Sequence, residues 1–377
     1  MIGLVVNPVA GVGGPAGLAG SDGADVQRLA RERGSRSCVQ ERAGLALTTL
    51  AARHPGLDVV TAAGPMGADA VETAGLVARI VHRPDASTTS ADDTTRAVAA
   101  VAAAGADLVL VVGGDGTLRD AAVALGEQPN TAVLGVPAGV KMYSPVFAVS
   151  PRAAGALAAD WVSEGGLPVF DREVLDIDEA AMRRAVVSPT LFGMLPVPSR
   201  VGRTQARKAG TPAGEKAAVE AAARGAVARM RRGIRYLLGP GGTTAEVARQ
   251  LGVEGSPLGI DVLLDGEIVV RAASEQQLLA AVAEGPAKAV ITVIGGQGFL
   301  LGRGNQQLSA SVLRALGDDP LLVVAPEQKL IDLHGRPLLV DTGDAELDAT
   351  LAGHVRIVTG PGATSLYAVS APELTPL

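Results

Sequence analysis

The chain has 377 residues, of which 47% are hydrophobic and 19% charged, enough apolar side chain to form the cores of two or three domains. A net charge of −6 argues against a general attraction to nucleic acid or anionic membranes. An aromatic content of 2% argues against platforms on which nucleic-acid bases stack. The single cysteine, Cys38, excludes an intramolecular disulfide, and no apolar run reaches the length of a membrane span, so we expect a cytoplasmic protein.

Apolar strands and helices alternate over residues 1–165. Ser90 followed by Asp92 and Asp93 is typical of a helix start, and it predicts the apolar helix Ala97–Ala104, which Gly105 ends. The strands expected here are Ile2–Val6, Leu57–Ala62, Ala78–His82, Leu108–Val112 and Ala132–Val136. This alternation predicts an α/β domain whose parallel sheet carries helices on both faces.

The pattern changes near residue 165, where two glycines and a proline interrupt it. We expect a second, more β-rich domain over residues 166–288, with strands Val169–Ile177, Leu191–Val197 and Val262–Val270. A long helix is predicted from about Glu215 to Arg235. Its arginines form either a solvated face or a group that steers phosphates into a cleft: Arg229, Arg231, Arg232 and Arg235.

Strand-like runs continue toward the end of the chain. They are Val290–Ile294, Leu321–Val324, Leu338–Val340 and Val355–Val358. We expect residues 289–377 to form a C-terminal α/β segment that packs back on the two preceding domains.

Four apolar runs end in glycine-rich turns: NPVAGVGG (7–14), GGDGT (113–117), GPGGTT (239–244) and GGQG (295–298). Where such a turn leads into a helix, unpaired N–H groups and the helix dipole favour an anion, and glycine lets a phosphate approach the backbone. The candidate phosphate-binding residues of the last three turns are Gly113, Gly114, Gly116, Thr117, Gly241, Gly242, Thr243, Thr244 and Gly296. Neither GxxxxGK[ST] nor GxGxxG occurs, so the P-loop and dinucleotide fingerprints are absent.

Asp115 stands between the glycines of the second turn, where phosphates would converge. A carboxylate there can accept the proton of a substrate hydroxyl, orient that hydroxyl, or hold Mg²⁺. Phosphoryl transfer needs mainly positioning and charge neutralisation, which this arrangement can supply. The alternative is an aspartate that caps the following helix, expected over Leu118–Leu125.

Three further polar residues are candidates for ligand contact. Lys141 follows a strand and a Pro-Ala-Gly turn, and is either a point charge for phosphate or a surface lysine. Arg303 and Asn305 lie in a polar, glycine-rich stretch that does not suit a core. The four scattered histidines and Cys38 have no metal-ligand spacing, so no zinc site is expected and the metal ligands are left open.

The NPxxG and GGDGT turns resemble those of the superfamily that contains NAD kinases and diacylglycerol-type lipid kinases. Longer stretches resemble the AcoX-type ATP-NAD kinase-like family. They include GVPAGVKMYSPVFAVSP (135–151), YLLGPGGTT (236–244), VIGGQGFLLGRGNQQLS (293–309) and VDTGDAELD (340–348). The matching stretches extend over nearly the whole chain.

This resemblance implies an NAD kinase-like fold: a Rossmann-like parallel-sheet domain, a β-rich second domain, and nucleotide bound between them. It implies transfer of the γ-phosphate of ATP, or of polyphosphate phosphate, to a hydroxyl, which in NAD kinases is the adenosine ribose 2′-OH of NAD. Asp115 matches the GGDGT aspartate as the catalytic residue, and Asn7 and Gly11 match the first-loop motif. Mg²⁺ and a homo-oligomer, a dimer or tetramer, are expected by the same analogy.

Two positions depart from the family pattern. The Asn-Glu pair that grips the NAD ribose in ordinary NAD kinases has no equivalent, which puts NAD as acceptor in doubt. Ala19, in GLAGSDG, stands where a lysine is expected, and a lost cation beside a phosphate loop would weaken ATP binding or mark an inactive member.

Three functions therefore stay open. The first is an ATP- or polyphosphate-dependent kinase of NAD or a related nucleotide, and the second is a kinase of another small-molecule or lipid hydroxyl. No strongly amphipathic basic-aromatic helix favours a lipid surface. The third is a non-catalytic nucleotide-binding regulator, which Ala19 favours and the retained GGDGT disfavours.

Overall fold

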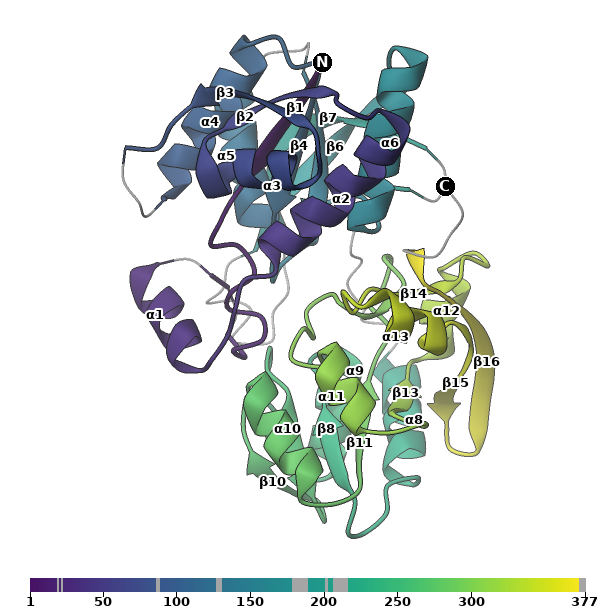
Figure 1. Ribbon diagram of the computed structural model, residues 1–377. Helices are drawn as coiled ribbons and strands as arrows, with labels where there is room; N and C mark the ends of the chain where they lie inside the picture. The colour runs from purple at the N-terminus through teal and green to yellow at the C-terminus, as the bar shows by residue number, and fades with distance from the viewer. Residues whose placement is uncertain are drawn as a thin grey trace.

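The computed structural model describes residues 1–18, 20–21, 23–85, 89–126, 131–177, 189–200, 203–205 and 216–372. It has two lobes, one above the other in Figure 1, each built on its own sheet. Among the described residues, no helix combines the length and the apolar character that a membrane span requires.

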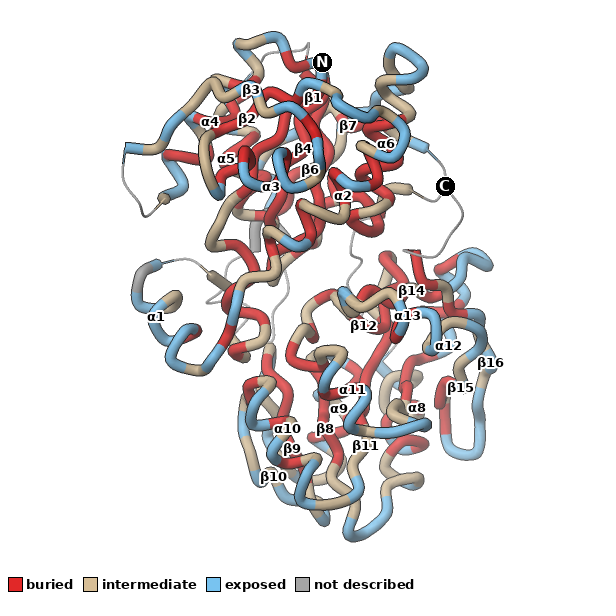
Figure 2. The backbone as a smooth tube through the Cα atoms, in the orientation of Figure 1, coloured by how far each residue is buried: buried red, intermediate tan, exposed pale blue. Residues whose placement is uncertain are grey.

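The first lobe contains a five-stranded parallel sheet in the order β3-β2-β1-β4-β5. Its strands are β1 (Ile2–Val6), β2 (Asp58–Ala62), β3 (Val77–His82), β4 (Leu108–Gly113) and β5 (Ala132–Pro137). Every residue of β1, β4 and β5 is buried, which Figure 2 shows as a red centre, because helices cover both faces of a parallel sheet. These strands lie within a residue of the predicted ones.

The helices of this lobe are α1 (Ala24–Glu32), α2 (Val39–Arg53), η1 (Gly64–Met66), α3 (Ala68–Thr73), α4 (Ala91–Ala103), α5 (Asp115–Leu125) and α6 (Pro151–Glu164). The chain moves outward from β1 through β2 to β3, then returns to β4 and β5 on the other side. Right-handed crossovers therefore place α2 and α3 on one face and α4 and α5 on the other. In agreement, α2 packs on α3 and α6, while α4 packs on α5.

An antiparallel ribbon of β6 (Val169–Ile177) and β7 (Pro189–Pro198) follows. Its residues Val174, Leu195 and Val197 are buried in the hydrophobic core of the first lobe. The structure thus differs from the domain boundary expected after residue 165, because the ribbon packs against β5 and α5 of the first lobe.

The second lobe contains a nine-stranded mixed sheet in the order β10-β9-β8-β11-β13-β15-β16-β14-β12. Its strands are β8 (Arg235–Leu238), β9 (Asp261–Leu264), β10 (Glu267–Val270), β11 (Ala287–Ile291), β12 (Phe299–Leu301), β13 (Leu321–Val324), β14 (Leu338–Val340), β15 (Gly353–Gly360) and β16 (Ala363–Ser370). Its helices are α8 (Lys216–Val227), α9 (Gly242–Gln250), α10 (Glu275–Ala283), α11 (Ala310–Ala315), α12 (Glu327–Ile331) and α13 (Ala345–Leu351). The prediction of a parallel-sheet domain followed by a second domain with more strands is confirmed.

Three details of the second lobe differ from the expectation. Helix α8 ends at Val227, since Gly233 turns the chain with φ of +77° and Arg235 opens β8, so the helix predicted to Arg235 is too long. Its expected start, Glu215, lies outside the described residues. The run 262–270 is a hairpin, β9 and β10, around Asp265-Gly266. The boundary expected between residues 288 and 289 falls inside β11, because both parts of the chain supply strands to one sheet.

Candidate active site

The strand order of the first lobe reverses between β1 and β4, and ligands of such sheets bind beyond the carboxyl ends of the strands at that reversal. Asn7 follows β1 there, and Gly114 follows β4. A cavity of about 450 Å³ opens at this point and is lined by residues of five segments, which begin at Asn7, Gly20, Thr89, Gly114 and Gly139. Candidate residues from the sequence lie in the first, fourth and fifth of these segments, the last through Lys141.

Glycines let three turns meet around the cavity. A Cβ on Gly139 would lie 2.3 Å from Gly114 Cα, and a Cβ on Gly114 would lie 2.8 Å from Lys141 O. Gly11 has φ of +75°, and a Cβ there would lie 2.3 Å from Ala138 O. Any side chain at these positions would push the turns apart, so the glycines are required by close backbone approach.

Two helix N-termini point their dipoles at the cavity. Helix α5 begins inside the GGDGT turn, and its N-cap residue Gly114 offers no side chain to its N–H groups. The first intrahelical bond is from Leu118 N to Gly114 O, so the N–H groups of Gly116 and Thr117 precede it. Helix α4 begins behind Ser90, whose N–H and hydroxyl both donate to Asp93 at 2.9 Å. The open end of α5 is the better anion site of the two.

Asp115 is buried, with 6% of its surface exposed, on the wall of the cavity. Its Oδ1 accepts hydrogen bonds from Ser144 N (3.0 Å) and Ser144 Oγ (2.6 Å), and its Oδ2 accepts one from Tyr143 N (2.7 Å). Burial raises the pKa of the carboxyl group, while the bonds from Ser144 and Tyr143 and the charge of Lys141 offset part of the rise. The carboxylate of Asp115 therefore binds the segment after β5 through Tyr143 and Ser144 and does not cap its own helix.

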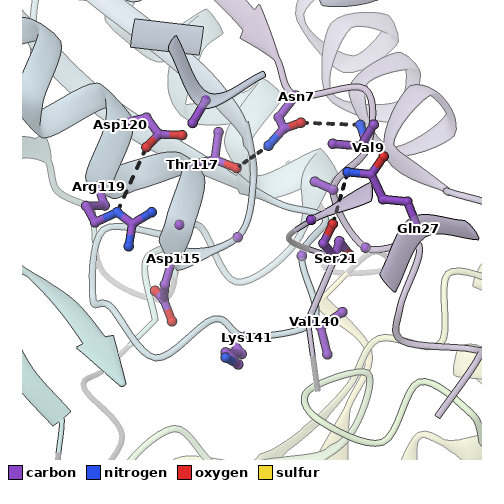
Figure 3. A pocket seen from close by; sticks show the side chains of 18 of the residues that line it. Asn7, Val9, Ser21, Gln27, Asp115, Thr117, Arg119, Asp120, Val140 and Lys141 are labelled. Carbon is purple, nitrogen blue, oxygen red and sulfur yellow. Dashed lines mark hydrogen bonds and ion pairs between the residues drawn. The ribbon is translucent and has the colours of Figure 1, made fainter. Parts of the chain in front are cut away.

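The remaining polar side chains surround the cavity (Figure 3). Asn7 Nδ2 donates to Thr117 Oγ1 at 3.1 Å and thereby ties the turn after β1 to the first turn of α5. On the side of the cavity away from Asn7, Arg119 Nε lies 3.9 Å from Asp120 Oδ1, and both residues line the cavity. Lys141 also lines it and acts electrostatically on Asp115. The cavity thus holds two cationic side chains beside a helix N-terminus, a combination that suits phosphate.

The other predicted phosphate-binding residues lie in the second lobe. Gly241, Gly242, Thr243 and Thr244 form the start of α9, and Gly296 follows β11. None of them lines the cavity described above. Their contact with phosphate stays a prediction.

Arg303 and Asn305 are 4% and 6% exposed, so both side chains are buried although their neighbours are partly exposed. Arg303 pairs with Asp341 and donates to Val149 O, and Asn305 donates to Leu300 O. Burial is possible because these side chains find partners within the protein. Neither residue lines the cavity, and their contact with a ligand stays a prediction. Ala19 lies outside the described residues.

Sequence reasoning missed Ser144, whose hydroxyl donates to Asp115 and accepts from Leu175 N at 3.0 Å. The segment MYSP carries no motif for this role, because its partner is 29 residues away in the chain. It also missed Gly139, although the Pro-Ala-Gly turn after a strand was a usable signal.

The described residues contain no group of three His, Cys, Asp or Glu side chains placed to hold a metal ion. Asp115 and Asp120 are carboxylates on the cavity wall. Mg²⁺ commonly binds one or two carboxylates together with substrate phosphates, so this donor set fits a magnesium ion that arrives with a nucleotide.

Family models match both lobes of the chain. Residues 2–166 match the ATP-NAD kinase N-terminal domain, and residues 231–369 match the ATP-NAD kinase C-terminal domain. Comparisons with curated proteins and with solved structures gave no match. The first match contains the whole cavity, and the second contains the nine-stranded sheet except the last residue of β16. The chain therefore belongs to the ATP-NAD kinase family, whose members are phosphotransferases that act on a hydroxyl group.

Proposed function

We propose that this protein transfers the terminal phosphate of ATP to the 2′-hydroxyl of the adenosine ribose of NAD⁺. The observation that carries the proposal is the position of Asp115. Its buried carboxylate lies on the wall of a cavity of about 450 Å³, at the reversal point of the sheet and at the open N-terminus of α5.

The donor phosphates would bind at the start of α5. The N–H groups of Gly116 and Thr117 precede the first intrahelical bond, and Arg119 and Lys141 supply positive charge from two sides of the cavity. Such fixed donors stabilise the charge on a transferring phosphoryl group without reorganisation. Mg²⁺ bound to the donor phosphates would neutralise further charge, with Asp120 as its protein ligand.

Asp115 would accept the proton of the attacking hydroxyl. Oδ1 already accepts two hydrogen bonds, whereas Oδ2 accepts one, from Tyr143 N. A carboxylate oxygen has about two acceptor sites, so Oδ2 keeps one for the hydroxyl. Because burial raises the pKa of Asp115, the ionised carboxylate is a stronger base than an exposed aspartate.

The test is formation of NADP⁺ by the purified protein from NAD⁺ and Mg²⁺, with ATP or polyphosphate as donor. Asp115→Asn should lower kcat by about 10²- to 10⁴-fold, the usual contribution of a general base. Asp58→Asn, at the exposed first residue of β2, is the matched control and should keep its activity.

Calorimetric titration with ATP shows whether the Asp115→Asn protein is still folded and loaded. Retained ATP binding without turnover supports the role of Asp115. Equal rates in wild type and Asp115→Asn refute it. A wild type that binds ATP but forms no NADP⁺ rules out NAD⁺ as acceptor and points to another hydroxyl compound.

A further inference from the structure

The segment that bonds the carboxylate of Asp115 belongs to no helix or strand. It comprises residues 138–144 and follows the last residue of β5. Asp115 accepts three hydrogen bonds from it, one from Tyr143 and two from Ser144. A segment outside the regular elements is positioned by whatever bonds its polar backbone groups. The partners of its carbonyl oxygens therefore decide where the donors to Asp115 lie.

Two buried glutamines bond the carbonyl groups on either side of Tyr143. Gln205 Nε2 donates to Met142 O at 3.1 Å and to Ser144 O at 2.8 Å, and Gln297 Nε2 donates to Met142 O at 2.9 Å. The two side chains are only 5% and 4% exposed. Met142 C=O and Tyr143 N–H belong to one planar peptide group. Donors that fix the oxygen therefore also fix the direction in which the N–H points.

Two glutamines that contact the segment come from the second lobe. Gln297 lies in the GGQG turn (295–298), between β11 and β12. Gln306 lies between β12 and α11, and its Nε2 donates to Gly139 O at 3.2 Å and to Val140 O at 3.4 Å. Both ends of the segment are thus bonded by side chains of the other lobe, so the position of the segment depends on that lobe.

We propose that Gln205, Gln297 and Gln306 are positioning residues for Asp115. They hold the carbonyl groups of segment 138–144, and the N–H groups of the same segment therefore stay on the carboxylate. The GGQG turn acts on catalysis in this way, through the side chain of Gln297. That Asp115 accepts a proton rests on the proposed function, whereas the hold of the glutamines on the segment is independent of the reaction.

The amide signal of Tyr143 reports this hold without turnover. The chain has three tyrosines, so labelling with ¹⁵N-tyrosine gives a nuclear magnetic resonance spectrum with three amide signals. The Tyr143 signal is the one that Tyr143→Phe removes. Its N–H donates to Asp115 Oδ2 at 2.7 Å, a short, charge-assisted bond, so its proton should resonate downfield. Asp115→Ala gives the position of the signal without that bond.

Gln297→Met keeps an unbranched side chain of similar length but removes the donor. It should move the Tyr143 signal toward its position in Asp115→Ala, and the double variant Gln205→Met/Gln297→Met should move it further. The other two tyrosine signals should stay, which shows that the fold is retained. The matched control is Gln40→Met, which removes a glutamine donor to Pro65 O (2.7 Å) away from the cavity and should leave all three signals unchanged.

Gln306→Met repeats the test at a less buried side chain and should move the Tyr143 signal in the same direction. A Tyr143 signal that stays in place in all of these glutamine variants of the segment would overturn the proposal. A joint shift of the three tyrosine signals in each of them would also overturn it, because it would show a general loss of structure.

Kinetics add a second readout. In a protein that forms NADP⁺, Gln297→Met should lower kcat by about tenfold and leave the KM for ATP within about twofold, because a misplaced base affects the transition state and not the binding of ATP. A raised KM with an unchanged kcat would contradict the proposal. A protein that forms no NADP⁺ contradicts the proposed function, while the Tyr143 signal still decides whether the glutamines hold the segment.

Discussion

The replacement Asp341→Asn should destabilise the protein strongly, because Asp341 joins the two lobes through a buried ion cluster. Its carboxylate follows β14 and is 1% exposed. Arg42 of α2 in the first lobe donates to both of its oxygens, at 2.7 and 3.0 Å. Arg303 donates to Oδ2 at 2.7 Å and, through its other nitrogen, to Val149 O of the first lobe. Asparagine would remove the negative charge that these two buried guanidinium groups share.

Two lines of reasoning each give a cost of a few kcal/mol. Removing one partner of a buried ion pair costs about 3 to 5 kcal/mol. Burial alone would raise the pKa of Asp341, but the charges of Arg42 and Arg303 outweigh it and lower the pKa from 3.8 to about 2. A difference of that size corresponds to about 2 to 3 kcal/mol of stability at neutral pH.

The sign of the pH dependence follows from that lowered pKa. The contribution of Asp341 is fully present above the unfolded-state pKa near 4 and is lost as the pH falls toward 2. The stability difference between wild type and Asp341→Asn should therefore be constant above about pH 5 and shrink below about pH 4.

Urea unfolding followed by far-UV circular dichroism measures this difference at pH 7, 5, 4 and 3. The control is Asp319→Asn, which removes an exposed carboxylate (85% exposed) in its pair with Lys288 and should cost less than about 0.5 kcal/mol. Equal costs for the two replacements, or a difference that grows on acidification, would refute the role of Asp341 as the link between the lobes.

Three further changes probe the cavity. Gly139→Ala should lower stability by about 2 kcal/mol or more and raise the KM for ATP, because the new Cβ would lie 2.3 Å from Gly114 Cα. Thermal melts measure the loss of stability, and initial rates measure the KM. Ser144→Ala removes a donor to the ionised form of Asp115, so the pKa of Asp115 should rise further and the acid limb of the kcat/KM profile should move to higher pH. Thr117→Val removes the acceptor of Asn7 and should weaken ATP, measured by calorimetry, by about three- to tenfold without changing the pH profile.

Local pattern was sufficient to predict the first sheet and to single out two of the turns that line the cavity. Continuous apolar runs predicted β1, β4 and β5, since short runs rich in valine that end at glycine or proline are typical of strands buried on both faces. Ser90 with its two aspartates gave the start of α4. The GGDGT turn pointed to Asp115 and to the start of α5. Its glycines carry no side chain that could cap the helix, so the N–H groups of the first turn stay open.

Tertiary structure alone decided which distant residues these groups meet. Sequence reasoning offered Asp115 as a base, a metal ligand or a helix cap, and only the fold placed Tyr143 N and Ser144 beneath its carboxylate. It offered Arg303 as a candidate for ligand contact, and only the fold placed Asp341 beside it, because β12 and β14 pair in one sheet. Hydrogen bonds and ion pairs depend on distance in space, and residues far apart in the chain become neighbours only when strand order brings their loops to the same edge of a sheet.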